Sequence, residues 1–133
     1  TYKGLKAWQE KIKKEVVKNL KVQTPQGFVR YFEKGTNQWS LENEALNLPI
    51  QGGAAESILK ALKHIGEKLN WEKAQIINCI HDEIIIESDD DYVEEAGKIL
   101  EEGMIQGFLD VFPKGCTRDL VEVGTGKNWA EAK

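Results

Sequence analysis

Three adjacent polar residues, His81, Asp82 and Glu83, interrupt an apolar, β-branched run between positions 74 and 86. Two neighbouring carboxylates at the tip of an apolar hairpin are costly if they are buried without compensation. A divalent cation supplies that compensation, because carboxylate oxygens are hard ligands suited to Mg²⁺. One pair is too few for a complete site, so phosphates, waters or another chain segment would have to supply the rest. Taken alone, an ordinary hairpin turn exposed to water explains the same pattern more simply.

Two amide side chains, Asn47 and Gln51, stand one helical turn apart in the segment Asn-Leu-Pro-Ile-Gln-Gly-Gly. Residues at i and i+4 project from one face of a helix. Two amides there could reach the hydrogen-bond acceptors of the DNA minor groove, which are similar for all base pairs. The competing explanation is a helix that kinks at Pro49, with both amides capping the backbone groups that the kink frees.

The C-terminal segment Gly-Thr-Gly-Lys-Asn-Trp, residues 124–129, contains a Gly-x-Gly spacing. A lone Gly-x-Gly is a weak indication of a phosphate loop, and the rest of the dinucleotide-binding motif is missing. We therefore expect a turn that docks Trp129. His64 stands among lysines on the polar side of its helix, where a surface position is expected rather than a metal ligand.

The first third of the chain has the pattern of a helix, a hairpin and the start of a second helix. Apolar residues at helical spacing predict a helix over residues 5–22. A turn at 23–27 and a short aromatic strand at 28–32 indicate a hairpin. Ser40 is expected to cap a long helix, and Pro49 is expected to kink or split it.

The remaining elements combine helices with strands. An apolar stripe predicts that the helix resumes over residues 55–69. Runs at 74–80 and 84–86 indicate two strands joined by the polar turn. Ser88 and the three aspartates that follow it open the next helix, and residues 119–123 alternate like a final strand. The predicted fold is α+β, with an antiparallel, hairpin-centred sheet packed with long helices.

Composition indicates a single soluble domain of 133 residues, 41% hydrophobic and 30% charged. No stretch approaches the roughly 18 apolar residues of a membrane span, and no signal peptide is recognisable. Two cysteines without metal-site spacing fit a reduced, cytoplasmic setting. Residues 1–34 carry a net charge of +6 and the remainder −10. The basic segment is either a phosphate-facing surface or a solvated lysine-rich helix.

In combination and in order, these motifs resemble the C-terminal region of family A DNA polymerases, the bacterial polymerase I type. The motifs are Asn-x-Pro-x-Gln-Gly, the apolar-flanked His-Asp-Glu and the terminal Gly-x-Gly-x-x-Trp. The segment Tyr-Lys-Gly-Leu-Lys-Ala-Trp at 2–8 is similar to the start of the helix that follows the family's fingers. The resemblance covers nearly all 133 residues. It implies that residues 1–133 are a single palm fragment, with a basic helix and hairpin at 1–34 and a palm core at 35–133.

The resemblance implies template-directed nucleotidyl transfer from a dNTP to the primer of primer–template DNA by a two-metal mechanism. The His-Asp-Glu turn would be motif C, in which Asp82 binds catalytic Mg²⁺ and Glu83 supports it. The other implied contacts are to DNA: His81, Asn47 and Gln51 at the primer terminus and minor groove, and Arg30, Lys14 and Lys18 at the backbone.

The chain also departs from the family pattern. The family's second catalytic aspartate, in motif A, and its fingers helix lie upstream of the matched region. Asn43 stands where many relatives carry an arginine, and Arg30 remains from a richer cluster. We therefore expect the isolated chain to be inactive and to require the N-terminal remainder of the polymerase, covalently or as a split partner.

Two other interpretations are open. The chain could be a non-catalytic DNA-binding or assembly subunit with a palm-like fold. It could also be a metal-dependent hydrolase that uses His81, Asp82 and Glu83, although His64 is the only other histidine to add to such a site.

Overall fold

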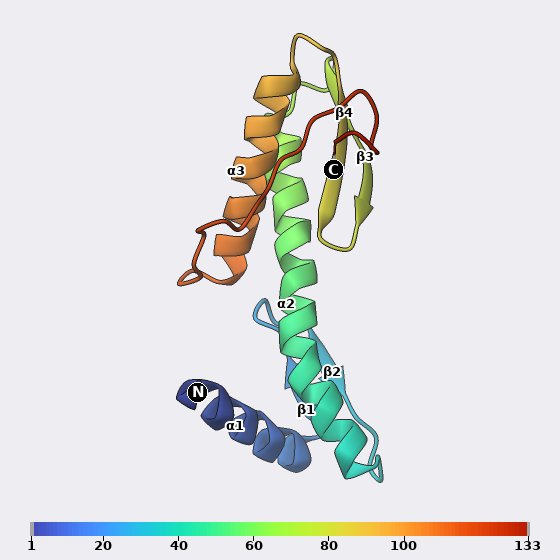
Figure 1. Ribbon diagram of the computed structural model, residues 1–133. Coiled ribbons are helices and arrows are strands. Elements are labelled where there is room, and N and C mark those ends of the chain that lie inside the picture. The colour runs from blue at the N-terminus through green and yellow to red at the C-terminus, as the bar shows by residue number, and fades with distance from the viewer. Residues whose placement is uncertain (1, 133) are drawn as a thin grey trace. The chain divides into compact units, whose positions relative to one another are not determined.

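The computed structural model describes residues 2–132, which form three helices and two separate antiparallel hairpins (Figure 1). The elements in order are α1 (Lys3–Asn19), β1 (Lys21–Gln23), β2 (Val29–Tyr31), α2 (Gln38–Lys68), β3 (Ala74–Ile80), β4 (Glu83–Ser88) and α3 (Val93–Val111). The predicted α+β class is confirmed. Two compact units divide the chain between Ala54 and Ala55, and α2 contributes residues to both. None of the helices in the described range is long and apolar enough to cross a membrane.

A small apolar cluster forms the core of the N-terminal unit. Its buried members are Val16, Val22, Leu41 and Ala45. Helix α1 ends at Asn19 rather than at the predicted residue 22, because Leu20 adopts a left-handed backbone with φ of 50°. The chain therefore turns into β1, which pairs antiparallel with β2. The predicted hairpin is confirmed, with two short strands in place of one.

Helix α2 differs from the sequence-based prediction at its start and at Pro49. Its first turn is capped by Asn37, whose Oδ1 accepts hydrogen bonds from the backbone N–H groups of Trp39 and Ser40 at 3.0 and 3.3 Å. The prediction of Ser40 as the cap is therefore wrong. Pro49 lies inside the uninterrupted helix, so the expected split does not occur. Ala45, one turn before Pro49, is buried in the core of the N-terminal unit, and this packing supports the helix against the lost hydrogen bond.

A larger apolar cluster forms the core of the C-terminal unit. Its buried members are Ala61, Ile65, Leu69, Ala74, Ile84, Tyr92, Ala96 and Ile99, from α2, both strands and α3. Strands β3 and β4 pair antiparallel from Ala74 opposite Ser88 to Ile80 opposite Glu83, with a bulge at Ile77. The two predicted strands and their polar turn are confirmed.

Two predictions for the C-terminal unit were wrong, one about the start of a helix and one about a strand. Helix α3 begins at Val93, because the acidic residues before it form a turn in which the Tyr92 N–H bonds the Asp89 carbonyl at 2.9 Å. Residues 119–123 are not a strand, since they pair with no other strand among residues 2–132. In Figure 1 this segment runs back alongside α3, and Val123 lies near Gly97 of that helix. Alternation alone does not make a strand without a hydrogen-bonding partner.

Candidate functional site

The His-Asp-Glu sequence forms the turn of the β3–β4 hairpin. Ile80 and Glu83 pair across the strands, which leaves His81 and Asp82 as a two-residue loop. His81 has φ of 54°, and Asp82 does not have positive φ. A turn in which only the first of the two central residues has a positive φ is a type II′ turn, and glycine is the usual residue at that first position. Ile84, directly after the turn, is buried in the core of the C-terminal unit and so holds the turn in place.

The two neighbouring carboxylates have different surroundings. Glu83 is half-buried, and its Oε1 accepts a hydrogen bond from the indole Nε1–H of Trp129 at 2.9 Å. Asp82 is exposed, and no group within residues 2–132 donates a hydrogen bond to its carboxylate. Asp82 is therefore the carboxylate whose oxygens remain available to an external ligand.

The turn does not form a complete metal site by itself. Within the described residues, no group of three or more His, Cys, Asp or Glu side chains could hold a metal ion. Asp82 supplies exposed, hard oxygen atoms, which suit Mg²⁺ as one ligand of a shared site. The hydrolase interpretation needs more ligands than this, and His64 instead bonds Asp110.

Asn47 and Gln51 lie in the part of α2 that belongs to the N-terminal unit. Both residues are exposed, and neither side-chain amide makes a hydrogen bond to the described part of the chain. They therefore do not cap backbone groups around Pro49, which was the competing explanation. The adjacent Gly52 has a packing role, because a methyl group on it would lie 2.5 Å from Thr24 Cγ2 in the same unit.

The three basic residues predicted to contact a DNA backbone differ in their surroundings. Lys14 and Lys18 are exposed, one turn apart on α1, and form no ion pair among residues 2–132. Arg30 of β2 is less free, since its Nη2 lies 3.6 Å from Glu44 Oε2 and its guanidinium lies 5.9 Å from the Phe32 ring centroid. The lysine face is the stronger candidate surface for phosphates.

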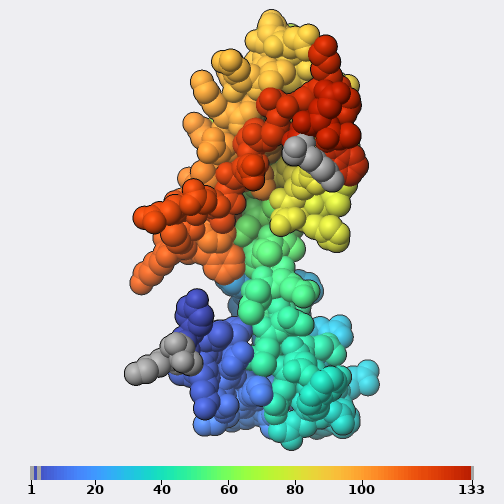
Figure 2. Space-filling model, in the orientation of Figure 1, coloured from blue at the N-terminus to red at the C-terminus, as the bar shows by residue number. Residues whose placement is uncertain are grey.

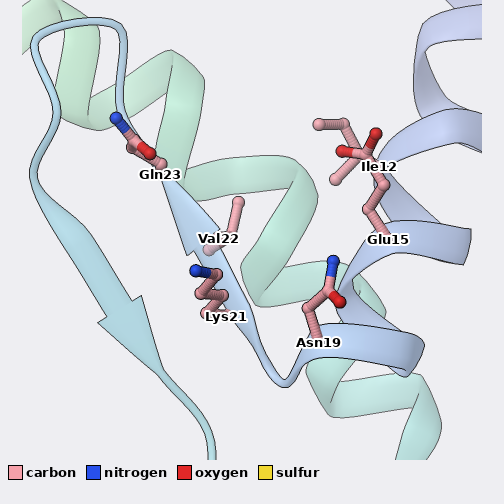
Figure 3. A pocket seen from close by; sticks show the side chains of 6 residues that line it. All are labelled: Ile12, Glu15, Asn19, Lys21, Val22 and Gln23. Carbon is pink, nitrogen blue, oxygen red and sulfur yellow. The ribbon is translucent and has the colours of Figure 1, made fainter.

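A hollow of about 190 Å³ lies between α1 and β1 in the N-terminal unit (Figure 3). Its lining residues are Ile12, Glu15, Asn19, Lys21, Val22 and Gln23. None of them is a predicted site residue, and the volume is below the roughly 300 Å³ at which small-molecule sites begin. The hollow is therefore not the candidate site.

A family model for DNA polymerase family A matches residues 1–131. This chain belongs to DNA polymerase family A. DNA polymerase I of Bacillus subtilis is 31% identical over 141 residues, which cover 100% of this chain and 15% of that relative. The thermostable DNA polymerase I of Thermus thermophilus is 29% identical over 139 residues, which cover 100% of this chain and 16% of that relative. The chain thus spans about a sixth of the length of these curated relatives.

A solved polymerase structure has a similar fold. It is the POL domain of Pol1 from M. smegmatis in complex with DNA primer-template and dNTP. The similarity has a TM-score of 0.70 at 24% identity and covers 77% of this chain and 19% of that chain. The three helices and two hairpins of the family A chain are therefore a polymerase-type fold.

Two contacts in this family A chain were missed at the level of sequence. The docking of Trp129 was predicted and is confirmed, but its partner Glu83, 46 residues away, was not predicted. His64 is not a plain surface residue, since its Nε2–H donates to Asp110 Oδ2 at 2.8 Å. The His64 imidazole, and after it Gln106, hold the pKa of Asp110 below its usual value. No sequence signal reveals such pairs, because the first depends on how the tail folds and the second on how α2 and α3 pack.

Proposed function

We propose that this chain is the C-terminal part of the palm of a DNA-directed DNA polymerase, with residues 80–84 as motif C. Residues 1–34 serve as its basic helix and hairpin, and residues 35–133 as its palm core. The reaction is template-directed transfer of a nucleotide from a dNTP to a primer 3′-hydroxyl. The observation that carries the proposal is the exposed Asp82 carboxylate on a fixed hairpin tip, in a chain matched by the family over residues 1–131.

Asp82 is the metal-binding residue in this proposal. Its oxygens are free of donors from residues 2–132, whereas Glu83 is already held by Trp129. Mg²⁺ bound there, as a pair of ions shared with residues outside this chain, would lower the pKa of the attacking hydroxyl and stabilise the leaving oxygens. Glu83 has a supporting role beside it.

The remaining site residues bind DNA in this proposal. His81, at the turn, contacts the primer terminus. Asn47 and Gln51 offer exposed, unpaired amides to the minor groove, where both can check base-pair geometry without reading sequence. Lys14 and Lys18 contact phosphates, as does Arg30 once it exchanges Glu44 for a phosphate oxygen.

The proposed site is incomplete without further polypeptide. Two ions need more ligands than the Asp82 carboxylate supplies, and residues 2–132 contain no group of three or more His, Cys, Asp or Glu side chains that could hold a metal ion. The second aspartate, the fingers and their triphosphate contacts come from the remainder of the polymerase, joined to this chain or bound to it as a separate subunit. The isolated chain is therefore inactive.

A primer-extension assay tests the proposal. The chain alone and the polymerase assembled from the chain and its N-terminal remainder are each incubated with recessed-end primer–template, dNTPs and Mg²⁺. Extension by the assembled polymerase only is the expected result. Extension by the chain alone would contradict the proposal that the site needs residues from outside this chain. Binding of recessed-end DNA without any extension by the assembled polymerase favours the non-catalytic DNA-binding subunit instead.

A further inference from the structure

The C-terminal tail, residues 124–132, folds back on itself through two glycines. A methyl group on Gly124 would overlap the carbonyl oxygen of Ala132, and one on Gly126 would lie 2.6 Å from Glu131 Cβ. Any other residue at either position would force the two arms of the tail apart. The Gly-x-Gly spacing therefore serves close backbone contact within the tail.

Hydrogen bonds around Glu131 hold the returning arm of the tail. The Glu131 carboxylate accepts from the Asn128 side-chain amide at 2.7 Å and from the Lys127 backbone N–H at 3.2 Å. The backbone N–H of Ala132 bonds the Asn128 carbonyl at 3.2 Å. These bonds span both sides of Trp129, so they limit the positions that its indole can take.

The folded tail places the Trp129 indole on the motif C turn. Figure 2 shows the tail, in red, lying on the surface against the yellow residues of the hairpin. The Trp129 Nε1–H donates to Glu83 Oε1 at 2.9 Å, and the residue is 45% exposed. The indole N–H can only donate, so the Glu83 carboxylate oxygen is the acceptor in this bond. Of the two adjacent carboxylates, the one that is hydrogen-bonded is Glu83.

We propose that Trp129 is a positioning residue that holds Glu83 away from the metal, which leaves Asp82 as the carboxylate of this turn that binds it. The inference rests on the proposed polymerase function. Without the indole, the Glu83 side chain gains other rotamers, and a second carboxylate competes for the coordination positions that phosphates or the primer hydroxyl should take. The chemical step then slows, although DNA and dNTP binding persist.

Trp129→Phe in the assembled polymerase tests this role, because phenylalanine keeps an aromatic ring and removes the donor. We expect kcat for nucleotide incorporation to fall about tenfold, with the KM for dNTP unchanged, since hydrogen bonds to charged groups are among the stronger ones. Trp71→Phe is the matched control. It removes an indole hydrogen bond to the Gly66 carbonyl in the same unit, away from the turn, and should leave kcat within about twofold of the parent rate.

A double-mutant cycle separates positioning from simple support of the tail. If Trp129 acts through Glu83, Trp129→Phe should change kcat by less than about twofold when Glu83 is already alanine. An equal loss in both backgrounds would mean that Trp129 only docks the tail, and it would overturn the inference. Normal incorporation by Trp129→Phe alone would overturn it as well.

A spectroscopic measurement keeps this inference distinguishable from the proposed function. In polymerase labelled with ¹⁵N-tryptophan, the Trp129 indole N–H resonance is assigned by its loss in Trp129→Phe. Glu83→Ala should shift that resonance and leave the Trp71 resonance in place. An unmoved Trp129 resonance contradicts the hydrogen bond. Absence of extension by every variant, the parent included, contradicts the polymerase function and not the contact.

Discussion

Gly107 of α3 lies directly against the backbone of Ala61 in α2, with no room for a side chain between them. A methyl group on Gly107 would overlap the Ala61 backbone nitrogen and would lie 2.6 Å from the Ser57 carbonyl oxygen. Backbone atoms of a helix cannot move aside as a flexible side chain can. The two helices of the C-terminal unit therefore depend on this glycine for their spacing.

Gly107→Ala should lower the free energy of unfolding of the chain by about 2–3 kcal/mol, because the added methyl forces α2 and α3 apart. Urea unfolding followed by circular dichroism measures it. Gly97→Ala in the same helix is the control, since its added methyl would meet Val123 Cγ1 at an ordinary 3.6 Å. That variant should be neutral or stabilised by up to about 1 kcal/mol. Equal losses for the two variants would contradict the close approach.

His81 carries its positive φ without being glycine, so its backbone should be strained. We expect His81→Gly to be about 1 kcal/mol more stable than His81→Ala, because both lose the imidazole and only alanine retains the strain. Unfolding of the two variants side by side measures the difference. A His81→Ala variant as stable as His81→Gly would rule out strain at the turn.

The same pair of variants addresses the proposed role of the imidazole. If His81 contacts the primer terminus, both variants of the assembled polymerase should bind primer–template more weakly than the parent, and by similar factors. Parental binding by His81→Gly together with weak binding by His81→Ala would instead assign the effect to turn geometry.

The His64–Asp110 hydrogen bond should make stability depend on acid pH. The imidazole and then Gln106 hold the pKa of Asp110 below its usual value of about 3.9. A carboxyl with a depressed folded-state pKa contributes stability above its usual pKa, and this contribution is lost as the pH falls through the depressed value. Asp110→Asn should therefore be less stable than the parent at pH 6, and the difference should shrink below about pH 4.

Unfolding midpoints of the parent and Asp110→Asn between pH 6 and pH 3 measure this effect. Glu101→Gln is the control, because Glu101 is an exposed carboxylate of the same helix that forms no ion pair within residues 2–132. Its stability difference from the parent should not follow the same profile. A difference for Asp110→Asn that is constant with pH would show that the pair contributes nothing through charge.

The sequence predicted those elements whose signal is local. Apolar periodicity gave the helices, and β-branched runs around a polar turn gave the β3–β4 hairpin. Features that depend on tertiary packing were missed or mistaken. Asn37 rather than Ser40 caps α2, and α2 is not split at Pro49. Alternation at 119–123 suggested a strand, although a strand exists only with a partner.

The candidate site also has residues that the sequence predicted and a contact that it did not. Residue types and spacing identified Asp82, Asn47 and Gln51, which the structure leaves exposed and without hydrogen-bond donors or acceptors from residues 2–132 for their side chains. The resemblance implied different roles for Asp82 and Glu83, but the hydrogen bond that makes their surroundings differ could not be predicted, since its donor, Trp129, lies 46 residues beyond Glu83. Such a contact requires the fold of the tail, which depends on glycines whose role is visible only in three dimensions.

The most direct test of the central claim is the single-turnover rate of nucleotide incorporation by the assembled polymerase with Asp82→Asn or Glu83→Gln. Loss of the metal-binding carboxylate should slow the chemical step on the order of 1,000-fold for Asp82→Asn, with primer–template binding retained. Glu83→Gln keeps an oxygen acceptor for Trp129 and should cost about tenfold or less. Equal losses for the two variants, or an Asp82→Asn rate within about tenfold of the parent, would contradict the assignment of Asp82 as the metal-binding residue.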